Sequence, residues 1–391
     1  MAAILTVATA GLRQDQLADS GHIRYPRVDY LELSHLIDTE ILNYTVYDHS
    51  PLGKLLRYLE TQLRSDLYLT MLGLWLQRSH QLIFAMSERA GIPFAALNKH
   101  LPYKRPLVAM FQCWSNRQEQ MIKKFDLFSS IDQIIVHCQS MKDQFITLGA
   151  KPEQIHVIHY SRDHRFFAPM PEVQQRKNFV LSVGETRSRN YAALFDAVKP
   201  LSSLDLLVAA SGGWDAREKN TSLQSFIPEN TSIVQRLPLL ELRNLYAQSQ
   251  FVVVPVHDTV FSAGSTVVLE SMSMGRAVVA FRSRGIADYI IDGETGLLVE
   301  PNNPAALRDA IQYLLSHPEE AQRLGQNARQ RVEEEFNLDI YVNRMAELIK
   351  RTAEASCSTK HPLPGSTVKD DFVDHILLEN TLSSGGKECH T

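Results

Sequence analysis

Short apolar runs alternate with segments of helical spacing along most of the chain. Runs that are rich in β-branched residues and bounded by turn residues predict buried strands. They lie at 3–8, 81–86, 93–97, 106–111, 131–138, 155–160, 179–183, 204–210, 232–236, 251–256 and 277–281. Apolar residues three or four positions apart predict helices at 51–62, 65–77, 114–128, 140–148, 239–248, 266–275, 304–316, 318–335 and 341–355. The alternation of strands and helices favours parallel sheets, so we expect an α/β protein built from Rossmann-like domains.

The stretch 251–301 combines a strand, a loop of small residues, a helix and a second strand. The sequences FVVVPV and AVVAF predict the two strands. Between them, Gly264 is free to take a strained turn, and helical spacing begins at Thr266. In a parallel sheet this loop lies at the carboxyl edge, where the helix start presents free backbone amides and a positive dipole. We therefore expect the amides around Gly264, Ser265 and Thr266 to hold a phosphate group.

The order of residues through the second half of this stretch resembles the donor-site half of GT-B glycosyltransferases. It is most similar to glycosyltransferase family 4, the retaining "glycosyl transferases group 1". Many residues recur in order over about fifty positions, which makes the resemblance specific. They are Glu270, Met272, Gly275, Ala277, Val278, Asp288, Asp292, Gly293, Thr295, Gly296, Leu297 and Leu298.

The resemblance implies roles for two positions that flank the helix start. The family has two glutamates eight positions apart, and Glu270 matches the second, which holds the ribose of the donor nucleotide. The first falls on Ser262, so the chain departs from the pattern where the family contacts the donor sugar. Ser262 is the candidate replacement, with Asp258 as an alternative. Taken alone, Glu270 would be read as an exposed helix carboxylate; within this run the resemblance favours the donor site.

A second loop, after the predicted strand 179–183, is expected to contact the donor diphosphate. The strand ends at Gly184, and a helix is expected to begin near Arg189. The family has two basic residues in this turn, and Arg189 matches the second. The first position is occupied by Glu185, so the chain departs from the pattern there. Arg187 is the basic residue nearest to that position. Arginine suits phosphate because its planar fork forms two parallel charge-assisted bonds. The alternative is two surface arginines in a polar loop.

The resemblance also divides the chain into segments. Residues 1–168 would form an acceptor-side Rossmann-like domain, and 175–340 the nucleotide-sugar donor domain, with a cleft between them. Asp163 falls where the family has the aspartate of its G-V-D hinge, but Ser161 and Arg162 replace the preceding residues. The helix at 341–355 is expected to cross back to the first domain. The polar tail 356–391 is expected to be mobile.

Composition narrows the functional classes. With 44% hydrophobic and 21% charged residues and a net charge of -4, the chain is an ordinary globular protein with no general attraction to nucleic acid. Its four cysteines have no zinc or redox spacing, and free thiols favour a cytoplasmic location. The start of the chain predicts a first strand and no signal peptide, and the apolar run 67–76 is too short to span a bilayer. No metal-ligand cluster, nucleotide-binding glycine motif or nucleophile elbow is present.

One basic segment bears on partners. Between Lys99 and Lys124 there are six basic residues and one acidic residue, and the predicted helix 114–128 carries an apolar stripe that includes Trp114. Such a helix can lie on an anionic membrane at its inner face. The alternative, which we favour, is that the stripe packs on the sheet and the charges are solvated.

Taken together, these features predict a retaining glycosyltransferase that moves a sugar from a nucleotide-sugar donor to a glycan, lipid or small-molecule acceptor, without a metal or other cofactor. No residue is nominated as a catalytic base, since the donor phosphate itself can accept the acceptor proton. The alternatives are a non-catalytic nucleotide-sugar-binding or partner subunit, which Ser262 supports, and a GT-B nucleotide-sugar epimerase. The sequence leaves the base, the sugar, the acceptor and the oligomeric state open.

Overall fold

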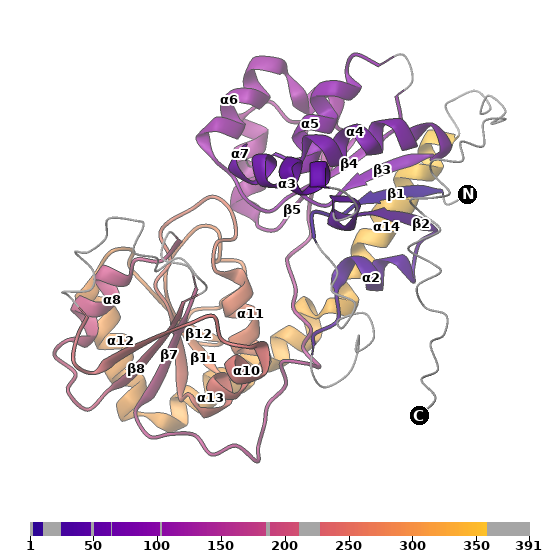
Figure 1. Ribbon diagram of the computed structural model, residues 1–391. Coiled ribbons are helices and arrows are strands. Elements are labelled where there is room, and N and C mark those ends of the chain that lie inside the picture. Colours follow the sequence, from indigo (N-terminus) through magenta and orange to yellow (C-terminus); the bar gives the residue numbers. More distant parts are fainter. Residues whose placement is uncertain are drawn as a thin grey trace.

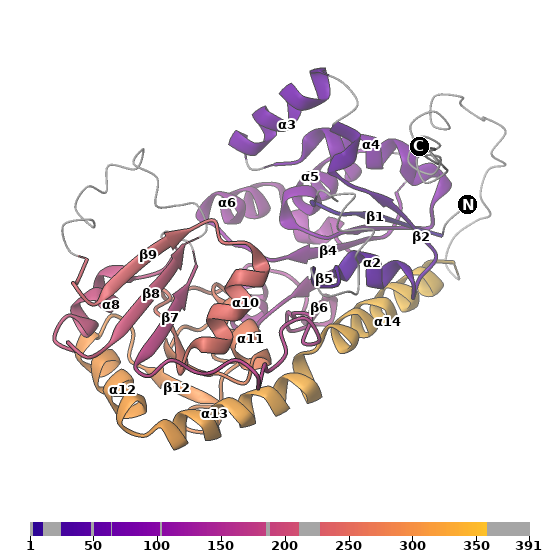
Figure 2. The same cartoon turned by 60° about the horizontal axis from the view of Figure 1, so that its bottom comes forward.

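The computed structural model describes residues 3–10, 25–47, 51–63, 65–101, 104–184, 188–210 and 227–357. Two six-stranded sheets dominate the structure, and all their strand pairs are parallel. Helices cover both faces of each sheet (Figures 1 and 2). The two Rossmann-like units predicted from the sequence are therefore confirmed.

The N-terminal sheet has the strand order β2-β1-β3-β4-β5-β6. Its strands are β1 (Ile4–Val7), β2 (Thr39–Leu42), β3 (Leu82–Ala85), β4 (Leu107–Phe111), β5 (Gln133–Val136) and β6 (Ile155–Val157). The helices of this half are α2 (Asp29–Ser34), α3 (Pro51–Leu63), α4 (Leu67–Leu76), α5 (Glu88–Asn98), α6 (Asn116–Phe125) and α7 (Gln139–Thr147).

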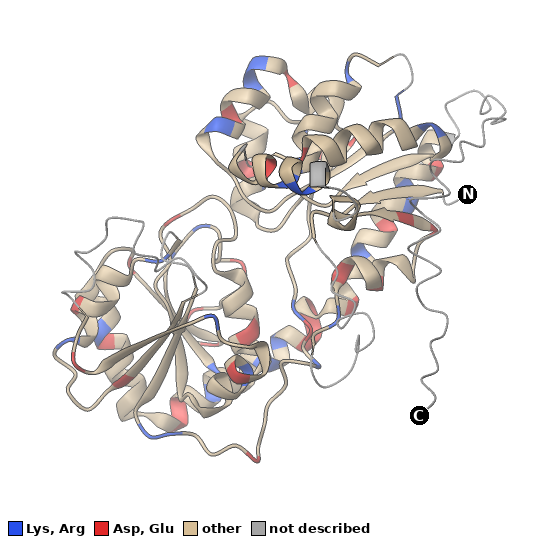
Figure 3. Cartoon of the chain, in the orientation of Figure 1, with Lys and Arg blue, Asp and Glu red and all other residues tan. Residues whose placement is uncertain are grey.

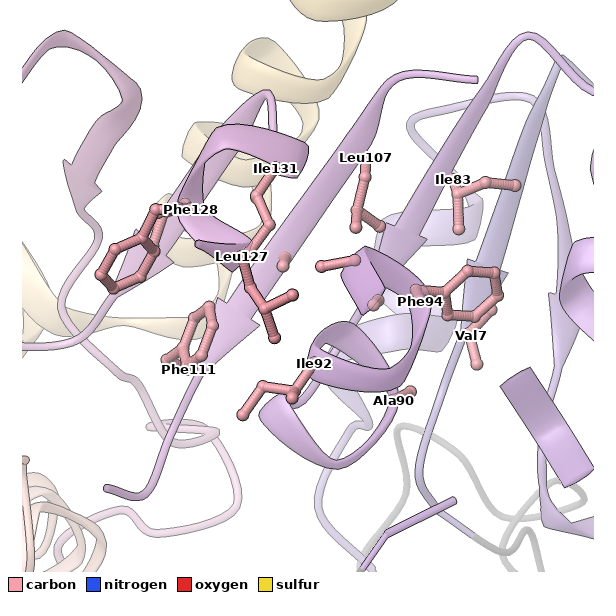
Figure 4. Close-up of a cluster of buried hydrophobic side chains, with 14 of the residues drawn as sticks. Val7, Ile83, Ala90, Ile92, Phe94, Leu107, Phe111, Leu127, Phe128 and Ile131 are labelled. Atoms are coloured by element: carbon pink, nitrogen blue, oxygen red, sulfur yellow. The ribbon is translucent and has the colours of Figure 1, made fainter. Parts of the chain in front are cut away.

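Alternate residues of these strands enter two separate cores, because successive side chains of a strand point to opposite faces. Ile83 packs in one core and Phe84 in the other. Figure 4 shows part of the first core, in which Ile92 of α5 lies toward Phe111 and Phe94 of the same helix lies beside Val7 and Ile83. Burial on both faces explains why the strands read as continuous apolar runs.

The C-terminal sheet has the strand order β12-β11-β10-β7-β8-β9. Its strands are β7 (Phe179–Val183), β8 (Asp205–Ala210), β9 (Thr231–Gln235), β10 (Phe251–Val254), β11 (Ala277–Phe281) and β12 (Gly296–Val299). Its helices are α8 (Tyr191–Val198), α10 (Leu239–Gln248), α11 (Ser265–Ser273), α12 (Pro304–Ser316) and α13 (Pro318–Arg331), followed by a π-helical turn (Val332–Phe336).

The last described helix, α14 (Leu338–Cys357), packs on the N-terminal half of the molecule (Figure 2). Tyr341, Met345 and Ile349 are buried in the core that contains Ile4 and Phe84 of the first sheet. This helix therefore ties the second sheet's half of the chain back to the first. The predicted tail 356–391 lies outside the described residues from 358 onward.

A small polar network fixes the crossing between the two halves. Asp163 of the hinge is 5% exposed and accepts hydrogen bonds from the backbone amide and the guanidinium of Arg27. The same guanidinium donates to Asp339 at the start of α14, at 2.6 Å, and Arg165 donates to the other oxygen of that carboxylate. The chain start, the hinge and the crossing helix are thus joined by charge-assisted bonds.

One predicted strand is wrong. The run 93–97 is helical and belongs to α5, with Pro93 inside the helix. Proline removes the amide that would bond the carbonyl of Arg89 four residues earlier. That carbonyl instead accepts the amide of Asp66, at 3.1 Å, just before α4. A tertiary hydrogen bond therefore replaces the helical one, which is why the proline is tolerated.

Among the described residues, α2, β2 and β12 were not predicted from the sequence either. Strand β2 has the sequence TEIL and lies at the edge of its sheet, where it pairs with β1 alone. Only half of its residues are apolar, because an edge strand is not covered on all sides.

The predicted helix 114–128 is α6 and a following 3-10 turn, and its Ile122 and Phe128 are buried in the core. Trp114 and Met121 are partly buried against the same core, and Phe125 is 49% exposed. Most of the apolar stripe therefore packs on the sheet.

Candidate functional site

The order of strands in the C-terminal sheet creates a switch point between β7 and β10. The chain runs from β7 to β8 and β9 on one side, and then returns to β10 on the other side of β7. Strands β7 and β10 therefore lie side by side, and the loops that follow their carboxyl ends lead in opposite directions. In open parallel sheets, ligands bind in the crevice at such a point.

Arg189 occupies this switch point. It is 6% exposed, and its Nε donates to the carbonyl of Val183 at the end of β7, at 3.1 Å, while Nη1 donates to Ser188 Oγ at 3.0 Å. The guanidinium passes so close to Gly184 that a Cβ there would lie 2.6 Å from Nε. A Cβ on Gly264 would lie 3.6 Å from Nη1. The two glycines thus leave room for a buried cation between β7 and the start of α11.

Helix α11 begins beside this guanidinium. Its N-cap, Gly264, has a φ of 91°, which is the left-handed region that glycine adopts readily, and no side chain caps the helix. The amides of the first turn have no acceptor within the helix. They and Arg189 together form a concentration of positive charge at the switch point.

The loop that leads into α11 is packed closely against the loop after β11. A Cβ on Gly285 would lie 1.8 Å from the carbonyl oxygen of Phe261. The carbonyl of Ser262 accepts the amide of Ser265 at 3.1 Å, which closes the turn before the helix. Ser262 is half-buried. Gly285 is therefore required for the approach of this loop.

Glu270 lies further along α11, where it is 3% exposed and fully engaged by neighbours. Its Oε1 accepts hydrogen bonds from Nε and Nη2 of Arg162, at 2.9 and 2.6 Å. Its Oε2 accepts the hydroxyl of Tyr246 at 2.9 Å. Burial and the adjacent carboxylate raise the pKa of Tyr246 well above its usual value, so this phenol remains a donor.

Arg162 comes from the hinge, at the position where the sequence departs from the family's G-V-D pattern. Burial acts to lower the pKa of its guanidinium, but Glu270 and the Tyr160 hydroxyl more than offset that effect, so the pKa is raised. The guanidinium also lies 5.8 Å from the centre of the Phe167 ring. The ion pair with Glu270 therefore joins the hinge to the helix of the switch point. Sequence reasoning noted the arginine but assigned it no role.

The carboxyl edges of the two sheets face each other across a set of direct contacts. The carbonyl of Val260 accepts hydrogen bonds from Ser140 Oγ at 2.9 Å and from the free thiol of Cys138 at 3.3 Å. The Asp288 carboxylate accepts the amide of Gln139 at the start of α7, at 2.7 Å. Burial acts to raise the pKa of Asp288, but His159 and this amide outweigh it and hold the pKa below its usual value. An anionic side chain of one half thus binds the helix N-terminus of the other.

Glu88 is a further titratable residue at the edge of the N-terminal sheet that sequence reasoning missed. It begins α5 after β3, is 6% exposed, and accepts the amides of Gln112 and Cys113 that follow β4. Burial raises the pKa of this carboxyl, although the amides act against that shift. Its hydrogen bonds hold the loop after β4 in place.

The predicted donor residues fall in separate places. The structure brings together Gly184, Arg189, Gly264 and Ser265 at the switch point, with Thr266 in the first turn of α11 and Ser262 in the preceding loop. Glu270 is buried in its ion pair with the hinge. Arg187, like Glu185, lies outside the described residues. Within the described ranges, no group of three His, Cys, Asp or Glu side chains could hold a metal ion.

Comparisons with known proteins agree with this architecture. Residues 165–331 match the sequence profile of the family described as glycosyl transferases group 1. The D-rhamnosyltransferase WbpZ of Pseudomonas aeruginosa is 24% identical over 327 residues, which are 77% of this chain and 84% of that protein. The alpha-maltose-1-phosphate synthase of Mycolicibacterium smegmatis is 26% identical over 249 residues, which are 57% of this chain and 64% of that protein. The match therefore spans less than two thirds of the second relative.

Solved structures share the fold over nearly the whole chain. Sucrose-phosphate synthase from Thermosynechococcus elongatus superposes with a TM-score of 0.69 at 19% identity, covering 90% of this chain and 99% of that one. Anabaena Alr3699/HepE, in complex with UDP and glucose, superposes with a TM-score of 0.65 at 18% identity, covering 90% and 100%.

The fold and these matches define the class: the protein is a glycosyltransferase with the GT-B fold. Its residues 165–331, which carry the switch point, match the family model of the glycosyl transferases group 1. The fold class and the enzyme class expected from the sequence are confirmed. No helix within the described residues is long and apolar enough to cross a membrane.

Proposed function

We propose that the protein transfers a sugar from a nucleoside diphosphate sugar to an acceptor, with retention at the anomeric carbon. The observation that carries the donor assignment is the position of Arg189, held beside Gly264 at the start of α11 and at the switch point of the sheet. A diphosphate placed there would meet a planar cation and a helix N-terminus together. The structural neighbour HepE was solved with UDP and with UDP-glucose, which supports a donor of this kind.

The chemistry follows from where charge develops. As the bond between sugar and phosphate breaks, negative charge grows on the departing nucleotide and positive charge on the sugar ring. Arg189 and the amides of the first turn of α11 stabilise the departing diphosphate more strongly than the bound donor, which is how such groups accelerate a reaction. We propose that these groups do this without a metal or other cofactor. The proton of the acceptor hydroxyl passes to the donor phosphate, since no side chain is assigned as the base.

The role of Glu270 depends on its partner. A carboxylate has about four acceptor sites, and in this structure hydrogen bonds occupy three of them, two on Oε1 and one on Oε2. We propose that Glu270 binds the donor ribose only when Arg162 withdraws from Oε1. Arg162 is suited to this because a quarter of its side chain is exposed, compared with 4% for Glu270. The hinge arginine and the ribose thus compete for one carboxylate.

The donor assignment is tested by calorimetric titration with UDP, GDP and ADP on the wild type, Arg189→Lys and Arg176→Lys. Arg176 is the matched control, because it pairs with Asp205 at the opposite end of β7 and is half-exposed. We expect one nucleotide to bind the wild type and the control equally, and Arg189→Lys to bind it about tenfold or more weakly, since lysine loses the planar fork. Equal binding by both lysine variants would remove Arg189 from the donor site.

The reaction is tested by following the sugar form of the nucleotide that binds. Consumption only with an acceptor, and a product with the donor's anomeric configuration by NMR, is the expected result. Inversion would refute retention, and conversion of the donor without an acceptor would indicate an epimerase. Binding without consumption across a broad acceptor panel would instead support a non-catalytic nucleotide-sugar-binding role, consistent with Ser262 at the usual glutamate position.

A further inference from the structure

Two adjoining helices of the N-terminal half expose large apolar side chains. They are Leu55 (53% exposed), Tyr58 (64%) and Leu59 (47%) of α3, and Leu67 (42%), Met71 (63%) and Trp75 (44%) of α4. Exposed single apolar residues are ordinary, but a contiguous stripe on each of two neighbouring helices marks an interaction surface. We call these six residues the α3–α4 surface.

Helix α3 is oriented with its apolar stripe outward. Leu55, Tyr58 and Leu59 are spaced three and four apart, so they lie on one face of the helix. The inner face carries Gly53 and the buried Glu60. A globular protein normally turns the apolar stripe of a surface helix toward its core. Figure 2 shows α3 at the outer edge of the N-terminal half.

Specific contacts on the inner face hold this orientation. Glu60 accepts the hydroxyl of Tyr47 on Oε2 and the amide of Tyr68 on Oε1, both at 2.5 Å, which binds α3 to the preceding 3-10 turn and to the start of α4. A Cβ on Gly53 would lie 2.4 Å from the carbonyl oxygen of Tyr47. Leu56 of the inner face packs against the core. The orientation of α3 is therefore built into the fold, and the helix cannot turn its exposed leucines inward without breaking these bonds.

Helix α4 is fixed in the same way. Leu67, Met71 and Trp75 are each four residues apart and form one exposed stripe. The opposite face is buried, and a Cβ on Gly73 would lie 2.4 Å from Cζ of Phe94 in α5. The close approach to α5 sets which side of α4 faces the solvent.

The charges of this region identify the partner. All three acidic residues between 51 and 105, Glu60, Asp66 and Glu88, are buried and accept hydrogen bonds from the protein. Lys54, Arg78 and Lys104 are exposed on the same segment. The charged positions of these helices can be followed in Figure 3. Exposed apolar stripes with exposed cations on the same chain segment are the pattern of a surface that lies on an anionic bilayer.

We propose that the α3–α4 surface binds the face of an anionic lipid bilayer, with its six apolar residues inserted at the headgroup boundary and the nearby lysines and arginines on the lipid phosphates. This location differs from the helix 114–128 considered from the sequence, because in that helix Ile122 and Phe128 are buried, Trp114 and Met121 are partly buried against the core, and Phe125 alone of the stripe is exposed. The proposal is independent of the donor assignment, since no residue of the switch point takes part in it.

Sedimentation with vesicles tests the proposal on the full chain. The vesicles consist of phosphatidylcholine alone, or of phosphatidylcholine mixed with phosphatidylserine, at low and high salt. We expect the wild type to sediment with the mixed vesicles at low salt and to be released by high salt. A protein that stays in the supernatant with mixed vesicles at low salt would overturn the proposal.

Two variants with matched controls locate the contact. Met71→Ser/Trp75→Ser is compared with Ile291→Ser/Tyr313→Ser, which changes residues that are 39% and 44% exposed in the C-terminal half. Lys54→Glu/Arg78→Glu is compared with Arg308→Glu, a residue of α12 whose side chain is 38% exposed. We expect each α3–α4 variant to lose binding by about tenfold or more, and each control to bind as the wild type does.

The same variants distinguish other occupants of the surface. Because all four changed residues are exposed, the variants should keep the wild-type melting temperature, which separates lost binding from misfolding. If Met71→Ser/Trp75→Ser binds vesicles as well as the wild type does, the surface is not the lipid contact. If the wild type is a dimer in solution and this variant is a monomer, the surface is an interface between two copies and the lipid proposal is wrong.

Discussion

The ion pair between Arg162 and Glu270 makes a quantitative prediction about stability. Replacing Arg162 by methionine keeps the bulk of the side chain but leaves Oε1 of Glu270 without its two donors, at a carboxylate whose side chain is 4% exposed. Breaking a buried pair from one side destabilises by about 3–5 kcal/mol. Because a quarter of the Arg162 side chain is exposed, water can partly replace it, and we expect a loss of about 2–3 kcal/mol in the free energy of unfolding.

A double-mutant cycle separates the pair from its surroundings. Glu270→Gln keeps an acceptor for Arg162 and leaves a guanidinium that water can reach, so we expect a smaller loss of about 1–2 kcal/mol. The double variant should lose less than the sum, with a coupling of about 1 kcal/mol or more, measured by urea unfolding. Additive losses, within about 0.5 kcal/mol, would show that the two residues do not stabilise each other.

The same variants decide whether Arg162 competes with the nucleotide. If the ribose needs Oε1 of Glu270, UDP or the nucleotide that binds best should bind Arg162→Met up to about tenfold more tightly, because a hydrogen bond to a charged group is worth about 1.5–3 kcal/mol. Glu270→Gln should bind it more weakly than the wild type. Calorimetry measures both. If Arg162→Met weakens binding as much as Glu270→Gln does, the arginine supports the site instead of blocking it.

Further predictions concern the glycine, histidine and aspartate positions. Gly184→Ala should lower the free energy of unfolding by about 2 kcal/mol or more and abolish nucleotide binding, because φ is 135° and the new Cβ would lie 2.6 Å from Arg189. Gly149→Ala is the control, since its φ is 98° and its new Cβ would have nothing within 4 Å. In the same unfolding assay it should show the cost of the backbone strain alone, about 1 kcal/mol. Burial lowers the pKa of His137 to about 4, whereas unfolded histidine titrates near 6.5, so stability should fall by roughly 3 kcal/mol as the pH drops from about 6.5 to about 4. His137→Asn should remove that part of the pH dependence of the unfolding free energy, and an unchanged pH dependence would contradict the assignment. Asp288→Asn should lose about 1 kcal/mol at pH 7, because the amide at the start of α7 then faces a neutral acceptor; wild-type stability would contradict a charged contact between the two sheet edges.

Much of the fold follows from local sequence signals. The central strands of both sheets, such as β3, β4, β10 and β11, are buried on both faces, so they appear as continuous apolar runs that local reasoning detects. Local reasoning fails where tertiary contacts decide the outcome. The run 93–97 looks like a strand because it is apolar, and it is helical because the carbonyl freed by Pro93 finds a donor in a distant segment. The edge strand β2 is missed because it lacks the apolar run that burial on both faces produces.

The residues of the proposed donor site also differ in how far the sequence predicts their positions. Gly184, Arg189 and Gly264 come together because each follows a strand of one parallel sheet, and the order of strands and helices along the chain is enough to place them at one edge. The partner of Glu270 depends instead on how the hinge, 108 residues earlier in the chain, approaches α11. The arginine at position 162 replaces an apolar hinge residue, which is a change that the sequence shows. Its effect depends on a contact with the buried carboxylate of Glu270, which the sequence does not show. Arg162 is therefore both the departure of the hinge from the family pattern and the residue that occupies Oε1 of Glu270. The affinity of Arg162→Met for nucleotide measures how this arginine affects the proposed donor site.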